Sequence, residues 1–188
     1  MTPFPDHPEA FTSPWLAEKL GFAPDALRGF TYEPVGTGQV GDSYRVSLDW
    51  RDGDGPATII AKVSAADATS RETARTMNLY EIEANWYRDY AADVGVRSPY
   101  AYFVGLEESD IGSFLLLMED LAPAQQISQM QGCDAQHVGL ALQEAALLHR
   151  AAWNDPQLAR TPWLNYGKGR KEFIGQLLVA VYPQWCQR

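Results

Sequence analysis

The sequence predicts an α+β fold: a five-stranded antiparallel sheet with one long helix, followed by helices only. Two observations predict this fold. Apolar and polar side chains alternate along residues 43–50, which is typical of a half-buried strand. After Glu119 the strand-like patterns stop, and apolar residues recur at helical intervals of three and four. The chain is therefore expected to contain a sheet-based part and then a helical part.

The composition restricts the class of protein. Among the 188 residues, 46% are hydrophobic and 21% are charged, which is ordinary for a folded globular chain. The 15 basic and 24 acidic residues give a net charge of −9, and the basic residues form no run. Nucleic acid and anionic membrane surfaces are therefore not expected as partners.

Further observations concern the location of the chain and its metal chemistry. No apolar run is long enough to span a membrane, and the N-terminal residues lack the order of a signal peptide, so a cytoplasmic protein is expected. Cys133 and Cys186 match no metal spacing and are expected to be free thiols. The histidines His7, His137 and His149 are scattered, so no zinc site is expected.

The N-terminal part is expected to contain one helix and three strands. The helix is predicted over 13–21, with a serine able to cap it, proline in its first turn and glycine at its end. Strands are predicted at 31–35, 43–50 and 57–63, with a Gly- and Asp-rich turn at 52–56. The third strand is mostly apolar and β-branched, which favours a central place in the sheet.

A stripe of apolar side chains predicts the long helix over 70–94. The stripe consists of Met77, Tyr80, Ala84, Tyr87, Ala91 and Val94. Gly95 is expected to end the helix, and Pro99 follows it.

The remaining elements follow in order. Two strands are predicted at 100–106 and 113–119, joined by an acidic turn at 107–112. Asp134 is a plausible cap for a helix that ends before Asn154-Asp155-Pro156. A last helix is expected from about residue 170 to 185.

A glycine-rich segment lies between the first two strands. Gly36, Thr37, Gly38, Gln39, Val40 and Gly41 fit the pattern G-x-G-x-x-G. A dinucleotide-binding loop of this pattern opens a helix, whereas this one opens the strand at 43–50. A glycine-rich hairpin is the means by which kinases bring backbone amides to the phosphates of ATP. The alternative is a hairpin turn whose glycines only allow positive φ angles, and the pattern alone leaves both interpretations open.

Lys62 is the second candidate for phosphate binding. It lies among apolar residues on the predicted central strand, where an ammonium needs an anionic partner. Kinases carry a lysine on their third strand for the α- and β-phosphates of ATP. The alternative is a lysine on a solvated strand face. Glu81 and Glu83 lie at opposite edges of the stripe on the following helix, and periodicity does not choose between them.

Taken in order, these motifs resemble the phosphotransferase family that includes aminoglycoside phosphotransferases, choline kinases and ecdysteroid-kinase-like proteins. The resemblance covers about residues 30–155. Its segments are Gly36 to Tyr44, Ile60 to Lys62, Glu83 to Arg88, Leu116 to Leu121 and Ala146 to Trp153. It implies a protein-kinase-like fold: a helical extension at 1–26, an ATP-phosphate-binding N-lobe at 27–119, and a hinge with the first helices of a C-lobe at 120–188.

The resemblance also implies roles for individual residues. It selects Glu83 as the partner of Lys62, because the family has an acid three residues before an aromatic pair. It implies that Glu119, Asp120 and Leu121 form the hinge, whose backbone binds adenine. The implied activity is transfer of the γ-phosphate of ATP to a hydroxyl group of a small-molecule acceptor, whose identity the sequence does not indicate.

The residues of the transfer step are missing from the sequence. Kinase chemistry needs a catalytic aspartate and a magnesium-binding aspartate after the hinge, and the chain contains no His-x-Asp. In His149-Arg150-Ala151 an alanine holds the aspartate's place, so His149 is predicted to be a packed histidine. Asp110-Ile111-Gly112 precedes the hinge and is predicted to be a turn. The chain alone is expected to be inactive, and Mg²⁺ is expected only in a complete protein.

Several interpretations stay open at this point. The C-lobe is expected to be incomplete, because the chain stops within it, and self-association through exposed C-lobe helices is expected. The chain is a shortened form of a longer protein, a truncated gene product, or a half-kinase with a binding role; the first two are favoured. The alternative function is a non-catalytic nucleotide-binding or protein-interaction module. A third reading is an unrelated α+β domain whose glycine loop is only a turn.

Overall fold

The computed structural model describes residues 4–36, 38–53, 55–107, 113–125, 127–128, 130–165 and 167–187. The chain divides into two compact units, Met1–Ala151 and Ala152–Arg188.

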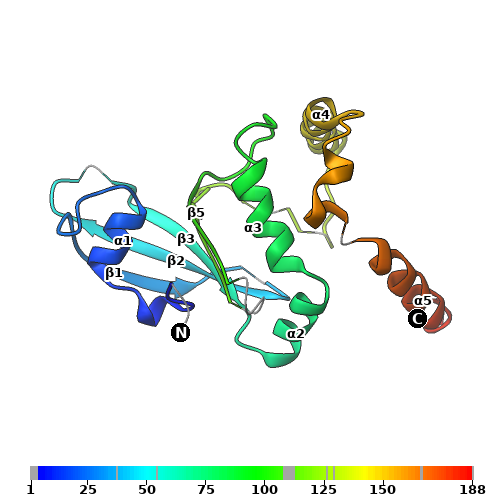
Figure 1. Ribbon diagram of the computed structural model, residues 1–188, viewed down its shortest axis with the longest axis horizontal. Coiled ribbons are helices and arrows are strands. Elements are labelled where there is room, and N and C mark those ends of the chain that lie inside the picture. The colour runs from blue at the N-terminus through cyan, green and yellow to red at the C-terminus, as the bar shows by residue number, and fades with distance from the viewer. Residues whose placement is uncertain are drawn as a thin grey trace. The chain divides into compact units, whose positions relative to one another are not determined.

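The first unit is built on a five-stranded antiparallel sheet with the strand order β1-β2-β3-β5-β4 (Figure 1). The strands are β1 (Leu27–Pro34), β2 (Gly41–Trp50), β3 (Thr58–Ser64), β4 (Ala101–Leu106) and β5 (Phe114–Glu119). β3 pairs with β2 on one side and β5 on the other, so it is the central strand. The predicted α+β fold with a five-stranded antiparallel sheet is confirmed.

One face of the sheet is covered by N-terminal residues. These include the 3-10 helix η1 (Pro8–Ala10) and α1 (Ser13–Lys19), which contacts β1 (Figure 1). Thr12, the residue before the predicted serine, caps α1: its Oγ1 accepts a hydrogen bond from the amide of Trp15 at 3.3 Å. The core on this face combines N-terminal and strand residues: Phe4, Phe11, Leu16, Ala17, Leu20, Leu27, Val46, Leu48, Trp50, Ile59, Ala61, Val63, Leu115 and Leu117. The extension is thus part of the main core of the sheet.

Two helices, α2 (Ala68–Thr76) and α3 (Leu79–Asp89), follow β3 in the chain. The second core cluster joins them to β5: Ala74, Tyr80, Ala84, Phe114, Leu116 and Met118. The Tyr80 ring stacks on the Phe114 ring, with centroids 5.2 Å apart and planes 7° apart. Because side chains alternate along a strand, Leu116 and Leu117 of β5 belong to different clusters on opposite faces.

The prediction of one long helix over 70–94 is wrong. The chain forms α2 and α3, separated at Met77 and Asn78. Asn78 has φ 52° and ψ 33°, a left-handed conformation that asparagine adopts more readily than most residues. The apolar stripe did not reveal this break. Tyr80, Ala84 and Tyr87 all lie on α3, so their spacing is the same in one continuous helix and in two separate helices. Side-chain periodicity shows which face of a helix is apolar, but it does not show the backbone angles of an individual residue.

The helix α4 (Ala135–Ala152) follows the sheet in sequence. Asp134 caps it as predicted, since its Oδ1 accepts a hydrogen bond from the amide of His137 at 2.9 Å. The carboxylate of Glu144 accepts a hydrogen bond from the amide of Arg97 at 2.9 Å. The prediction that His149 is packed is wrong: no residue of α4 is buried, and His149 is exposed. The apolar side chains Val138 and Leu142 of this helix are exposed as well.

The second unit contains the 3-10 helices η2 (Leu158–Arg160) and η3 (Pro162–Asn165) and the helix α5 (Gly167–Trp185). The prediction of a final helix is confirmed, and it begins three residues before the expected start. Cys133 and Cys186 are both free and exposed. In the part of the chain that the structure describes, no helix has the length and apolar character needed to cross a membrane.

Candidate functional site

The glycine-rich segment connects the antiparallel strands β1 and β2, as the sequence predicts. Gly36 has φ 76°, a conformation that favours glycine. A Cβ atom at Gly38 would lie 2.0 Å from the carbonyl oxygen of Gly41, so the loop leaves no room for a side chain there. These requirements hold for a simple hairpin as well as for a phosphate loop. Thr37 lies outside the described residues.

Gly41 differs from the other two glycines because it faces the lysine. A Cβ atom at this position would lie 3.1 Å from the carbonyl oxygen of Val63 and 3.6 Å from Cε of Lys62. The first distance is tighter than ordinary van der Waals contact, and Val63 O is backbone that yields little. Glycine at position 41 therefore lets the start of β2 lie against the Lys62 side chain.

Strand register places Lys62 on the α3 side of the sheet. Lys62 lies opposite Ser43 of β2 and Leu116 of β5. Directly opposed residues of antiparallel strands project from the same face. Leu116 belongs to the cluster with α3, so Lys62 shares the face that α3 covers.

Lys62 forms an ion pair with Glu83 of α3. Its Nζ lies 2.6 Å from Oε1 and 2.7 Å from Oε2 of Glu83. Each side chain is 29% exposed, so the pair is partly withdrawn from water. The two contacts need two of the three N–H donors of an ammonium group. Periodicity left Glu81 and Glu83 as alternatives; the structure pairs Lys62 with Glu83.

Tyr80 makes two hydrogen bonds in this region that the sequence did not predict. Its hydroxyl donates a hydrogen bond to the carbonyl of Val40 at 2.5 Å and accepts one from the amide of Ala65 at 2.9 Å. The residue is 2% exposed, and burial raises the pKa of the Tyr80 hydroxyl above its usual value. Its only signal in the sequence is a tyrosine within an apolar stripe, because a buried tyrosine usually finds a hydrogen-bond partner.

The predicted hinge residues are fastened in different ways. The amide of Glu119 donates to the carbonyl of Tyr100 at 2.8 Å, and its Oε2 accepts from the Tyr100 amide at 3.1 Å. The carbonyl of Leu121 accepts from the amide of Ala124 at 2.8 Å, and the Leu121 side chain is half exposed. The Glu119 side chain therefore binds the residue just before β4.

Asp120, the middle residue of the predicted hinge, is bound to β2. Nε of Arg45 donates to Oδ2 of Asp120 at 2.7 Å, and Nη2 donates to Oδ1 at 3.3 Å. Oδ1 also accepts from the amide of Ala122 at 3.0 Å, and the Asp120 side chain is only 4% exposed. The Arg45 guanidinium, together with the Ala122 amide, lowers the pKa of Asp120. The Asp120 carboxylate is thus occupied by contacts within the protein.

Arg45 was also missed by sequence reasoning. It is a polar member of the alternating pattern of β2, and such positions ordinarily face solvent. In the register it lies opposite Ile60, two residues before Lys62, on the same face of the sheet. Its partner is 75 positions further along the chain, and no local pattern indicates a contact at that separation.

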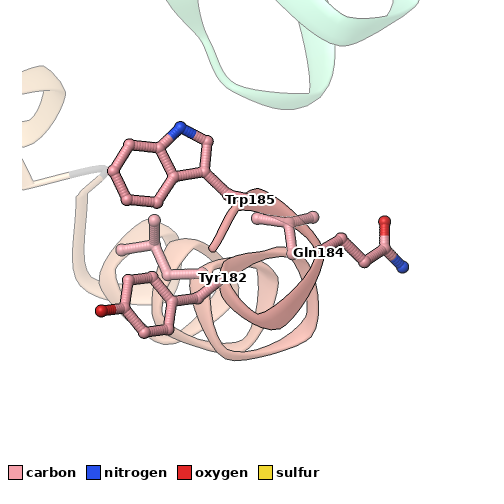
Figure 2. Close-up of a pocket in the computed structure, with 5 residues that line it drawn as sticks. Tyr182, Gln184 and Trp185 are labelled. Carbon is pink, nitrogen blue, oxygen red and sulfur yellow. The ribbon is translucent and has the colours of Figure 1, made fainter. Parts of the chain in front are cut away.

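A concavity of about 460 Å³ lies on α5. Leu178, Val181, Tyr182, Gln184 and Trp185 line it (Figure 2). The Tyr182 and Trp185 rings lie along one side of the helix, whereas the Gln184 amide points away. The lining has no charged side chain, so it offers no counter-charge for a phosphate.

Asp110-Ile111-Gly112, predicted to be a turn, lies outside the described residues. Among the residues that the structure does describe, no group of three or more His, Cys, Asp or Glu side chains is placed to hold a metal ion. Comparison of the chain with models of protein families, with curated proteins and with solved structures finds no match.

Proposed function

We propose that the chain is the ATP-binding part of a small-molecule kinase, a relative of the aminoglycoside phosphotransferases and choline kinases. The observation that carries the proposal is the Lys62–Glu83 pair, with the glycine-rich hairpin against the stem of the lysine. Kinases combine these parts: a glycine-rich loop over the phosphates, a lysine on β3, and a glutamate on the next helix that orients the lysine.

The energetics of the pair support a role beyond stability. Withdrawing both charges from water costs free energy that their attraction repays only partly, so a partly buried pair adds little net stability. A lysine held by a carboxylate is, however, well placed to receive a second anion. In the proposed complex, Lys62 binds the α- and β-phosphates and Glu83 fixes its position.

The other residues of the candidate site also have proposed roles. Backbone amides of the loop at 36–41 approach the phosphates, and the backbone of Glu119, Asp120 and Leu121 binds adenine. The transfer step needs a catalytic aspartate and magnesium ligands. We propose that these come from outside the 188 residues, because no His-x-Asp occurs among them.

The proposal predicts that ATP binding depends on Lys62. Isothermal titration calorimetry of the chain with ATP, with and without Mg²⁺, should show binding. Lys62→Ala should weaken it at least about tenfold, equivalent to about 1.4 kcal/mol, because a charged contact to the phosphates is lost. Glu83→Gln should weaken it in the same direction.

Two matched variants control for loss of charge elsewhere. Lys19→Ala removes a lysine that lies 5.6 Å from the Phe103 ring, in the α1 region, and should leave ATP affinity unchanged. Glu81→Gln removes the carboxylate that periodicity could not separate from Glu83, and should also have no effect. Unchanged affinity in a folded Lys62→Ala variant would contradict the phosphate-binding role.

A second candidate function is a non-catalytic nucleotide-binding module, which the absence of His-x-Asp favours. Incubation of the chain with γ-labelled ATP and a panel of sugars and amino alcohols tests whether the chain transfers phosphate by itself. Both candidates predict no labelled product from this chain alone. Labelled product would show that the chain itself supplies a general base. Absence of ATP binding would remove both candidates.

A further inference from the structure

We propose that Tyr80 is a positioning residue that fastens the glycine-rich loop to the helix carrying Glu83. In this role its hydroxyl keeps the loop and the Lys62–Glu83 pair in one relative placement. The inference rests on the proposed function, because it assigns a task within the same phosphate site.

The contacts of Tyr80 join three separate segments. Its hydroxyl donates to the carbonyl of Val40 in the loop and accepts from the amide of Ala65, just after β3. Ala65 follows Lys62 by three residues, and Tyr80 precedes Glu83 by three residues, about one helical turn. One hydroxyl thus binds the loop, the end of the lysine strand and the glutamate helix.

The ring cannot leave this position without disrupting the core. Tyr80 is 2% exposed and stacks on Phe114, which is fully buried. A Cβ atom at Gly41 would lie 3.8 Å from Cε1 of Tyr80 and 3.6 Å from Cε of Lys62. The last glycine of the loop therefore lies against both the tyrosine ring and the lysine stem.

The Tyr80 hydroxyl bonds to backbone atoms of Val40 in the loop and of Ala65 just after β3. A hydroxyl has one donor and can also accept, and both capacities are used. Removing it leaves the Val40 carbonyl and the Ala65 amide without this partner, while the ring and its stacking remain. Tyr80→Phe therefore changes the attachment of the loop and little else.

Titrations with ATP and with adenosine test this role. In Tyr80→Phe the affinity for ATP should fall about five- to tenfold, whereas the affinity for adenosine should stay within about twofold, because only the phosphates contact the loop. Tyr102→Phe, which removes a half-buried hydroxyl from β4, should change neither affinity. An equal loss for both ligands, or no loss for ATP, would overturn the assignment.

Hydrogen exchange of the nucleotide-free chain tests the attachment independently of any ligand. Tyr80→Phe should raise amide exchange at residues 38–44 severalfold while β5 stays protected, and Tyr102→Phe should not. Unchanged exchange in the loop of folded Tyr80→Phe overturns the inference even if ATP binds. If the chain binds no ATP, the proposed function fails, and the exchange measurement alone decides whether Tyr80 holds the loop.

Discussion

At the scale of one residue, the side chain of Asp120 has a structural role, although the residue belongs to the predicted hinge. Its carboxylate contacts Arg45 and the Ala122 amide and is almost completely buried. Asp120→Ala should lower the free energy of unfolding by about 1–3 kcal/mol at neutral pH, toward the lower end because water reaches Arg45. Urea denaturation measures this. Asp49→Ala, at an exposed surface pair with Arg28, should change it by less than about 0.5 kcal/mol.

The contribution of Asp120 should also depend on pH. Its pKa in the folded chain is lowered from the usual 3.8, mainly by the Arg45 hydrogen bond. A lowered pKa means that the stabilisation is fully present above pH 3.8 and is lost as the pH falls through the folded value. The difference between the wild-type chain and Asp120→Ala should thus be constant between about pH 7 and pH 5 and shrink below about pH 3.8. A difference that grows on acidification would contradict this.

The sequence indicated some residues of the site better than others. Lys62 was predictable, since a lysine amid apolar strand residues needs an anion. Glu83 was not separable from Glu81 by spacing, and it was chosen by resemblance to a family. The contacts of Arg45 with Asp120 and of Tyr80 with Val40 were not predictable, because they join residues 75 and 40 positions apart. Local patterns determine faces, whereas such contacts depend on how the strands and helices are placed.

At the scale of elements, the break between α2 and α3 can be tested by substitution of Asn78. A continuous helix and a left-handed residue predict opposite effects of Asn78→Ala on stability. Alanine has a higher helix propensity than asparagine, so Asn78→Ala would stabilise a continuous helix. Asn78 instead has φ 52°, a left-handed conformation that costs most L residues about 1–2 kcal/mol and that asparagine tolerates better than alanine. Asn78→Ala should therefore destabilise the chain by about 1 kcal/mol in urea denaturation. Asn78→Gly should be close to neutral, because glycine adopts positive φ angles freely.

The strands were predicted more accurately than the helices, for a physical reason. Alternation along β2 and the apolar character of β3 report burial directly, and burial defines the sheet. β1 begins at Leu27, four residues before the predicted start, because a register shift between Leu27 and Gly29 interrupts the alternation there. The helix break depends on a single backbone angle, which composition does not record.

At the scale of the whole molecule, the apolar surface of α5 predicts self-association. Leu178 is 58% exposed, Tyr182 60% and Trp185 70%, and the Tyr182 and Trp185 rings lie along one side of the helix (Figure 2). Contiguous apolar surface of this kind favours contact with other apolar surface. Sedimentation velocity should show an average mass that rises with protein concentration. Leu178→Glu should weaken this rise by placing a charge within the apolar face.

The control for this measurement is a charge of the same sign elsewhere on the same helix. Gln176→Glu adds one negative charge at an exposed polar position of α5, so it should leave the self-association unchanged. If both variants dissociate the assembly equally, the cause is general charge repulsion on a chain of net charge −9. The apolar face of α5 would then not be the contact between copies. If neither variant has an effect, the contact between copies lies on another surface. Weakening by Leu178→Glu alone assigns the contact to α5.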